Sequence, residues 1–264
     1  MSGGSAARSL DDHARQLREQ GFTCLPGLLP SETTAEFAAA LRAQWERLGQ
    51  PGLYSREDIW LEPGVHVSPV GMTCAGILGR VPGTAAVLLR PELLGLFEAI
   101  LGPGFELELG AGIVSDHTRP FFFWHHHVGG IDGEDFRGRP YSDAVRAERV
   151  VCTLYCSPVD DEHGTMLVWP RAITDSVAPP FTPSSEPWPG ATAVQAPVGT
   201  VIVFDQGTWH AVTPMTRTGQ RYFVGFFVRR AGLPPTVRRD ETIAAALARD
   251  PALASAYGQP GASA

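Results

Sequence analysis

A run of three histidines, His125 to His127 in the segment FFFWHHHVGG, is the region of the chain best suited to bind a metal ion. Alternate side chains of an extended strand point to the same side, so His125 and His127 converge while His126 faces away. His210, in FDQGTWHAV, follows a later apolar run and is placed to supply a third imidazole. Such a set on a β-scaffold commonly binds a single metal ion. The alternatives are a solvated turn for the triplet and a structural core histidine for His210; the aromatic run before the triplet favours burial.

Arg221 opens another apolar run, RYFVGFFVRR, eleven residues after His210. A guanidinium does not lose its proton in a protein, so an arginine that enters a buried strand needs an anionic partner. That partner is either an acidic side chain of the protein or the carboxylate of a ligand, bound through two parallel N–H groups. The sequence leaves both possibilities open.

Composition excludes several classes of function. The 21 basic residues are all arginine, so lysine-dependent chemistry (Schiff bases, pyridoxal phosphate anchors, phosphate-loop lysines) is excluded. A net charge of −7 argues against a general nucleic-acid partner, and no apolar run approaches the 18 residues of a membrane span. The first residues do not form a secretory signal. We therefore expect a cytoplasmic protein with reduced thiols at its four cysteines, which have no CxxC spacing: Cys24, Cys74, Cys152 and Cys156.

The elements that must position these residues change in type along the chain. Helical periodicity is expected over 10–20, from Ser31 to about Leu48, over Pro91–Leu101 and over 240–249. Apolar runs separated by turn residues predict a short strand and turn over 22–29 and strands over 105–114, 119–124, 149–156, 165–169, 200–205 and 221–230. This order predicts a mostly β fold with flanking α-helices, as one domain over 1–264: a helical N-terminal region over residues 1–104, a β core of about 105–230 and the helix 240–249.

The segment REQGFTCLPGLLPSETTAEFAAAL resembles the N-terminal signature of the phytanoyl-CoA dioxygenase-like family. The order of a WH pair, a turn containing proline, and then His210 with Arg221 resembles that family too, over about residues 17–230. The resemblance implies a double-stranded β-helix core of the jelly-roll or cupin-like type. It also implies an enzyme, a dioxygenase that uses Fe(II), 2-oxoglutarate and O2 to hydroxylate a small-molecule substrate.

Carried over by position, the family's metal ligands are His125, His127 and His210. Arg221 would bind the distal carboxylate of 2-oxoglutarate, and Thr213 would assist it. The chain departs from the family at His127, where an acidic ligand is usual. A three-imidazole site is neutral and also suits zinc, nickel or copper, so the native metal is open. An acid of the following loop is an alternative ligand: Asp132, Glu134 or Asp135.

Three functions follow from these observations. The first is an iron and 2-oxoglutarate-dependent oxygenase that hydroxylates or otherwise oxidises a fairly apolar organic molecule. The second is a three-histidine dioxygenase, lyase or isomerase on the same fold that does not use 2-oxoglutarate. The third is a non-catalytic binding protein. Aromatic residues near the histidines are candidates for the substrate pocket: Phe123, Trp169 and Trp209. Loops 50–90, 128–148 and 176–192 are expected to form a lid, because loops commonly carry specificity.

Overall fold

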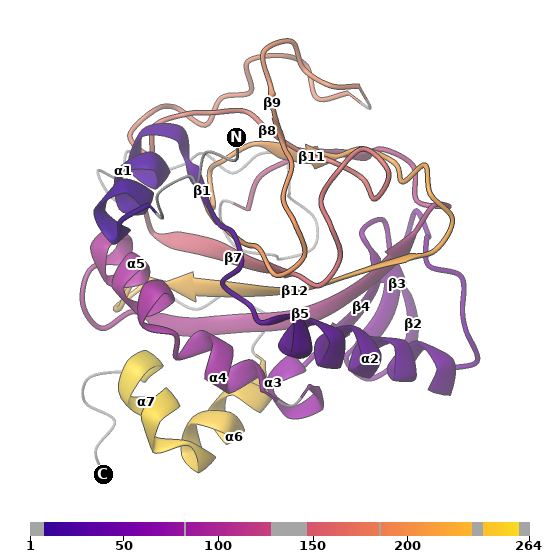
Figure 1. Ribbon diagram of the computed structural model, residues 1–264, viewed down its shortest axis with the longest axis horizontal. Helices are drawn as coiled ribbons and strands as arrows, with labels where there is room; N and C mark the ends of the chain where they lie inside the picture. Colours follow the sequence, from indigo (N-terminus) through magenta and orange to yellow (C-terminus); the bar gives the residue numbers. More distant parts are fainter. Residues whose placement is uncertain (1–7, 82, 128–146, 185, 234–239, 259–264) are drawn as a thin grey trace, which may run out of the picture.

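Two antiparallel β-sheets face each other, and helices cover the outer side of the larger sheet (Figure 1). The structure is a computed structural model that describes residues 8–81, 83–127, 147–184, 186–233 and 240–258. The acids Asp132, Glu134 and Asp135, proposed above as alternative ligands, lie outside the described residues. The mostly β architecture with flanking helices is confirmed, and it is consistent with a double-stranded β-helix core.

The larger sheet has eight strands in the order β1-β10-β7-β12-β5-β4-β3-β2, all paired antiparallel. Their bounds are β1 Phe22–Leu25, β2 Ile59–Glu62, β3 Val65–Ser68, β4 Gly71–Ala75, β5 Glu106–Asp116, β7 Arg149–Tyr155, β10 Val201–Asp205 and β12 Gln220–Arg229. The smaller sheet has the order β6-β11-β8-β9. Its bounds are β6 Phe122–His125, β8 Met166–Val168, β9 Thr192–Val194 and β11 His210–Val212.

Alternation along β12 divides the larger sheet into two faces. Val224 and Phe226 belong to the main hydrophobic core under the helices, whereas Phe223 and Phe227 face the space between the two sheets. Both kinds of side chain are apolar, which is why the strand reads as an unbroken hydrophobic run rather than an alternating one.

Within the described ranges, seven helices accompany the sheets: α1 Leu10–Gln20, α2 Ser31–Arg47, α3 Ile77–Arg80, α4 Thr84–Leu88, α5 Pro91–Leu101, α6 Glu241–Arg249 and α7 Pro251–Tyr257. The α2 stripe packs on the larger sheet as its spacing predicts, with Phe37 and Leu41 fully buried and Trp45 partly buried. Close approach of α2 to β5 requires Gly112, because a Cβ there would lie 2.3 Å from Cδ2 of Leu41.

The structure differs from the sequence-based expectation in three places. Ser31, a residue type that favours the cap position before a helix, is instead the first residue of α2, and Pro30 occupies the cap position without a side-chain capping bond. Residues 59–75, part of the segment 50–90 expected to be a lid loop, instead form β2, β3 and β4 and extend the larger sheet. The C-terminal helix is followed by α7, for which the Asp250 side chain accepts bonds from the first turn.

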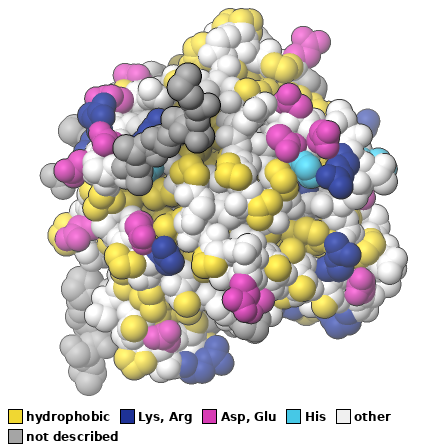
Figure 2. Space-filling view, viewed as in Figure 1, with side chains coloured by type: hydrophobic (Ala, Val, Ile, Leu, Met, Phe, Trp, Pro, Cys, Tyr) yellow, Lys and Arg dark blue, Asp and Glu magenta, His cyan; other side chains and the backbone are white. Residues whose placement is uncertain are grey.

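The exterior carries mixed charge. On the face shown in Figure 2, arginines are scattered among acidic and apolar side chains, without a broad basic area. Among the helices of the described ranges, none has the length and apolar character needed to cross a bilayer.

Candidate metal centre

The three histidines selected from the sequence lie together between the sheets. β11 pairs with β6 so that His210 lies opposite His125, and His127 follows two residues later along the same segment. Their candidate ligand atoms all lie within 4.8 Å of one another, and all three side chains are buried. The ring centroids of His125 and His210 are 4.1 Å apart, and that of His127 lies 5.1 and 4.9 Å from them. Antiparallel pairing therefore brings together residues that are far apart in sequence.

Backbone carbonyls fix the orientation of two rings. Nδ1 of His125 lies 2.8 Å from the carbonyl oxygen of Phe123, and Nδ1 of His210 lies 3.0 Å from that of Thr208. A carbonyl only accepts, so Nδ1 carries the proton in both rings and Nε2 presents a lone pair. This is the usual arrangement of metal-binding imidazoles, in which the outer nitrogen donates to the protein. The backbone N–H of His127 donates to the carbonyl of Gln206 at 2.7 Å.

His126 lies on the other side of its strand, as the alternation of side chains requires. Its ring contacts that of Trp209 edge to face, with centroids 4.7 Å apart, and it is 2% exposed. Trp209 belongs to an aromatic cluster with Trp124 and Trp188, in which the last two rings stack at 4.2 Å. This cluster supports the ligand segments from outside the cavity.

Burial favours the neutral form of two of the candidate ligands, His127 and His210. It lowers the pKa of His210 to about 4, and burial together with the neighbouring imidazoles lowers the pKa of His127 well below its usual value. A neutral imidazole is the form that binds a metal ion, so the protein environment favours the binding form at neutral pH.

These shifts predict that the metal-free protein loses stability in mild acid. Below pH 6.5 the unfolded chain binds protons at His210 that the folded chain does not, so the free energy of unfolding falls as the pH drops from about 6.5 towards 4. A shift of this size corresponds to about 3 kcal/mol for His210. Urea unfolding of metal-depleted protein across this range should therefore show a shallower pH dependence for His210→Gln than for the parent. Equal slopes would contradict the prediction.

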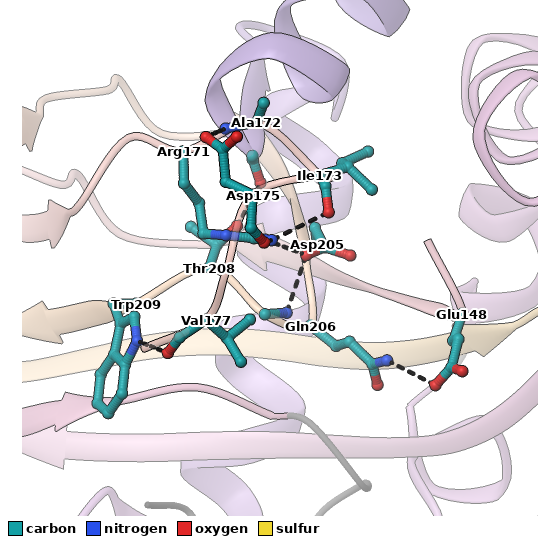
Figure 3. A network of polar contacts seen from close by, with 12 residues as sticks. Glu148, Arg171, Ala172, Ile173, Asp175, Val177, Asp205, Gln206, Thr208 and Trp209 are labelled. Carbon is teal, nitrogen blue, oxygen red and sulfur yellow. Dashed lines mark hydrogen bonds and ion pairs between the residues drawn. The ribbon is translucent and has the colours of Figure 1, made fainter. Parts of the chain in front are cut away.

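A buried ion pair holds the loop that carries His210 (Figure 3). Nη1 of Arg171 donates to Oδ2 of Asp205 at 2.7 Å, and Nη2 donates to the carbonyls of Ile173 and Asp175. Oδ2 of Asp205 also accepts from the N–H of Gly207 at 3.0 Å. Burial raises the pKa of Asp205 to about 6, against the opposing effect of Arg171. This pair was not among the residues predicted from the sequence.

Gly21, which ends α1, anchors the same loop. It adopts a left-handed conformation with φ of 77°. Its carbonyl accepts from the N–H of Asp205 at 2.8 Å and from the Thr208 hydroxyl at 2.9 Å. Since the Thr208 carbonyl in turn accepts from His210, the N-terminal region of the chain fixes one candidate ligand.

A cavity of about 1330 Å³ extends from the histidines between the sheets. It includes His125, His127 and His210, and Arg221 lies in its wall. The lining also includes aromatic residues: Phe122, Phe123, Tyr155, Phe204, Phe223 and Phe227. It includes charged residues as well: Arg56, Glu57, Asp58, Arg80, Arg119 and Asp240. A concave site that combines apolar walls with converging polar groups typically binds a small molecule.

Arg221 is 2% exposed, and its guanidinium lies 5.1 Å from the centre of the Tyr155 ring. Its Nε is buried and makes no hydrogen bond with the described residues. No carboxylate in the described ranges comes within 4.0 Å of the guanidinium. Burial lowers the pKa of Arg221, against the opposing effects of Tyr155, which interacts with it directly, and of the more distant Asp160, which bonds to His163 at 2.7 Å. The sequence left open either an acidic side chain of the protein or a ligand carboxylate as the partner of Arg221. The described residues do not supply an acidic side chain.

The remaining predicted site residues have different surroundings. Phe123 lines the cavity. The Thr213 hydroxyl accepts from the N–H of Thr165 at 2.8 Å, so it holds the start of β8. Trp169 and Trp209 pack in the aromatic cluster on the other side of the smaller sheet, where Nε1 of Trp209 donates to the Val177 carbonyl at 2.8 Å.

Comparisons with known proteins identify similar folds. No protein-family model matches the chain, and no curated protein matches its sequence. The non-heme alpha ketoglutarate dependent carbocyclase SnoK from nogalamycin biosynthesis superposes with a TM-score of 0.63 at 20% identity, over 89% of this chain and 91% of SnoK. The epimerase SnoN from the same biosynthesis gives 0.59 at 18% identity, over 84% and 81% of the two chains. HygX from Streptomyces hygroscopicus, with nickel and 2-oxoglutarate bound, gives 0.57 at 16% identity, over 84% and 87%. At these identities the likeness shows the fold.

Proposed function

We propose that this protein is a non-haem iron oxygenase that uses 2-oxoglutarate to hydroxylate, or otherwise oxidise, a fairly apolar small molecule. One observation carries the proposal: a three-histidine cluster and a buried guanidinium without a carboxylate partner among the described residues lie in the wall of one cavity. We further propose that the chain belongs with the phytanoyl-CoA dioxygenase-like enzymes whose sequence features it resembles.

The donor set fits a divalent transition metal. Three neutral imidazoles, two of them oriented through Nδ1, suit iron and equally nickel, copper or zinc. We assign the ligands as His125, His127 and His210. A bound iron ion, with 2-oxoglutarate and O2, would supply the oxidising power for attack on a substrate C–H bond.

The position of Arg221 fits the distal carboxylate of 2-oxoglutarate. His210 is the first residue of β11. Thr213 follows the end of this strand, three residues or about 10 Å beyond His210. His210 and Arg221 line the same cavity, so a dicarboxylate that contacts the metal at one end could direct its other carboxylate towards Arg221. Arg221 would hold the far carboxylate through parallel N–H groups and so orient the molecule. Thr213 would assist by fixing the backbone of β8 beside it.

The rest of the cavity would exclude water and hold the substrate. Its volume of about 1330 Å³ exceeds the usual range of about 300–1000 Å³ for small-molecule pockets, so it has room for the co-substrate together with an organic substrate. Phe123 and Phe223 are candidates for apolar contacts with that substrate. We propose no such role for Trp169 and Trp209, which pack behind the smaller sheet.

Similar structures support the choice of cofactors. SnoN has been solved in complex with Fe3+, alpha ketoglutarate and nogalamycin RO, and HygX with nickel, 2-oxoglutarate and hygromycin B. One of these relatives in fold is a carbocyclase and another an epimerase, which is why the proposal includes oxidations other than hydroxylation.

A second candidate is a three-histidine enzyme that does not use 2-oxoglutarate. His127 favours it, because the resemblance leads one to expect an acid at that position. The two candidates differ in whether Arg221 binds a carboxylate.

Visible spectroscopy without oxygen tests the first candidate. Fe(II) added to metal-depleted protein, followed by 2-oxoglutarate, should produce a charge-transfer band only when both are present. Arg221→Met should keep Fe(II) and lose at least about 90% of the band at the same concentration of 2-oxoglutarate, because the charge-assisted bonds to one carboxylate are removed. Arg217→Met, at a surface arginine, is the matched control and should resemble the parent. Iron binding without any band would favour the second candidate.

A further inference from the structure

A second buried arginine, Arg119, lies in the same cavity wall as Arg221. It is 3% exposed, and it donates to the carbonyl of Thr213 at 3.1 Å and to that of Pro120 at 3.3 Å. Both acceptors are neutral. Among the described residues, no carboxylate comes within 4.0 Å of Arg119. Asp116, which precedes it, is bonded instead to the N–H and hydroxyl of Thr118.

The two guanidinium groups converge on one point, next to Gly164. A Cβ built on Gly164 would lie 3.2 Å from Nη1 of Arg221 and 3.6 Å from Nη2 of Arg119. It would also lie 2.8 Å from the carbonyl oxygen of Thr213. A side chain at this position would clash with the Thr213 carbonyl and crowd both guanidinium groups, so glycine, with a φ of 90°, lets the two arginines lie close together in the cavity wall.

This arrangement places like charges together out of water. Burial, with a further contribution from Arg221, lowers the pKa of Arg119 to about 9, so the side chain still carries its charge at neutral pH. Burial of a cation is costly unless an anion and hydrogen bonds compensate for it. Among the described residues the hydrogen-bond acceptors of Arg119 are neutral carbonyls, and Asp116 and Tyr155 act on it only through charge. Arg221 interacts with Tyr155, and its Nε has no partner among them. A bound anion would supply what the protein does not.

We propose that Arg119 and Arg221 together form an anion subsite, in the cavity wall that both line, that binds a single carboxylate between two guanidinium groups. Resting on the proposed function, this carboxylate is the distal one of the dicarboxylate co-substrate. A carboxylate has two oxygens and about four acceptor positions, so it can accept from both arginines at once. Arg119 then determines specificity, because a monocarboxylate of the same length leaves both charges without an anion. The subsite is made by the protein alone and should bind dicarboxylates without a metal ion.

Calorimetry on metal-depleted protein tests this subsite. The metal is removed on a chelating resin, since soluble polycarboxylate chelators would compete for the site. Succinate, a dicarboxylate without a keto group, should bind and raise the melting temperature, whereas butyrate, of the same length, should bind at least about 10-fold more weakly. 2-Oxoglutarate should displace succinate. Arg119→Met and Arg221→Met should each weaken succinate binding at least about 10-fold, and Arg119→Lys, which keeps the charge without the fork, should lie between Arg119→Met and the parent.

The outcomes separate the subsite from the proposed function. Unchanged succinate affinity in folded Arg119→Met, with loss in Arg221→Met, overturns the role of Arg119 and leaves the oxygenase proposal standing. Absence of succinate binding in a protein that gives the iron and 2-oxoglutarate band overturns a subsite independent of metal. Succinate binding that depends on both arginines, in a protein without the band, supports the subsite and contradicts the proposed function. If Arg119→Met does not fold, Arg119→Lys is the test variant. A succinate affinity equal to that of the parent then overturns the requirement for a guanidinium group at this position.

Discussion

His125→Ala is expected to abolish metal binding at micromolar concentrations, with a loss of affinity for Fe(II) of more than about 100-fold. Changes to the outer partners of metal ligands already cost about 10- to 100-fold, and this change removes a ligand itself. The remaining imidazoles, His127 and His210, would leave a two-donor site. Anaerobic titration with Fe(II), followed by metal analysis after gel filtration, measures the effect. Turnover, once a substrate is known, should fall below detection.

The histidine triplet provides its own control. His126→Gln removes the imidazole between the two ligands, but His126 faces Trp209 and not the cavity, so Fe(II) affinity should stay within about threefold of the parent. His127→Asp should retain iron, because it places an acid at the position where the phytanoyl-CoA dioxygenase-like family, which this chain resembles, has an acidic ligand. Loss of metal in His126→Gln with retention in His125→Ala would exchange the assignments and reject the proposed ligand set.

Arg171→Met is expected to lower the free energy of unfolding at pH 7.5 by about 3–5 kcal/mol, the cost of leaving one charge of a buried pair without its partner. Asp205 is fully buried, and even with Arg171 present its pKa is raised to about 6. Without Arg171 the pKa rises further, so the carboxyl is neutral in the folded variant at pH 5.5. Its contribution to stability is retained at low pH and lost as the pH rises through the folded-state pKa. Urea unfolding at pH 5.5 and 7.5 should show the larger loss at pH 7.5.

Two further variants interpret the Arg171 result. Arg171→Met with Asp205→Asn removes both charges and should recover some of the stability at pH 7.5. Arg217→Met is the surface control, with an expected change of less than about 0.5 kcal/mol. An Arg171→Met loss that does not depend on pH would mean that packing and carbonyl contacts, rather than the charge of Asp205, account for the effect. The variant should also weaken metal binding, because the same loop orients His210.

Much of the fold follows from local pattern. The α1 and α5 helices have clear ends at Gly21 and Gly102, and the strands around the histidines are apolar runs bounded by turn residues. The hairpin strands β2 to β4 were not identified, because their sequence mixes charged, proline and glycine residues with short apolar stretches. They are strands because β4 pairs with the edge of β5. Such long-range pairing leaves little signal in a local window.

The residues of the candidate site also fall into those that a local sequence pattern indicates and those that it does not. The period of a strand is enough to separate His125 and His127 from His126, and Arg221 stands out as a charge within an apolar run. Arg119 follows a turn and precedes a proline, where an exposed arginine is common, so nothing local marks it. Asp205 ends an apolar strand, which is a weak sign of a buried carboxylate, but its partner Arg171 lies 34 residues away. Contacts at that separation become visible only when the sheets are assembled.

The pairing of β6 with β11 joins two histidines that the ribosome adds to the chain at different times. His125 and His210 face each other across the ladder, yet 85 residues separate them in the chain. At about 5–20 residues per second, the ribosome delivers the last imidazole roughly 4–17 s after the first. Until then the nascent chain carries only two of the three proposed ligands, His125 and His127. Metal loading of the proposed three-histidine site would therefore be an event of the completed chain, at which the available divalent ions would compete.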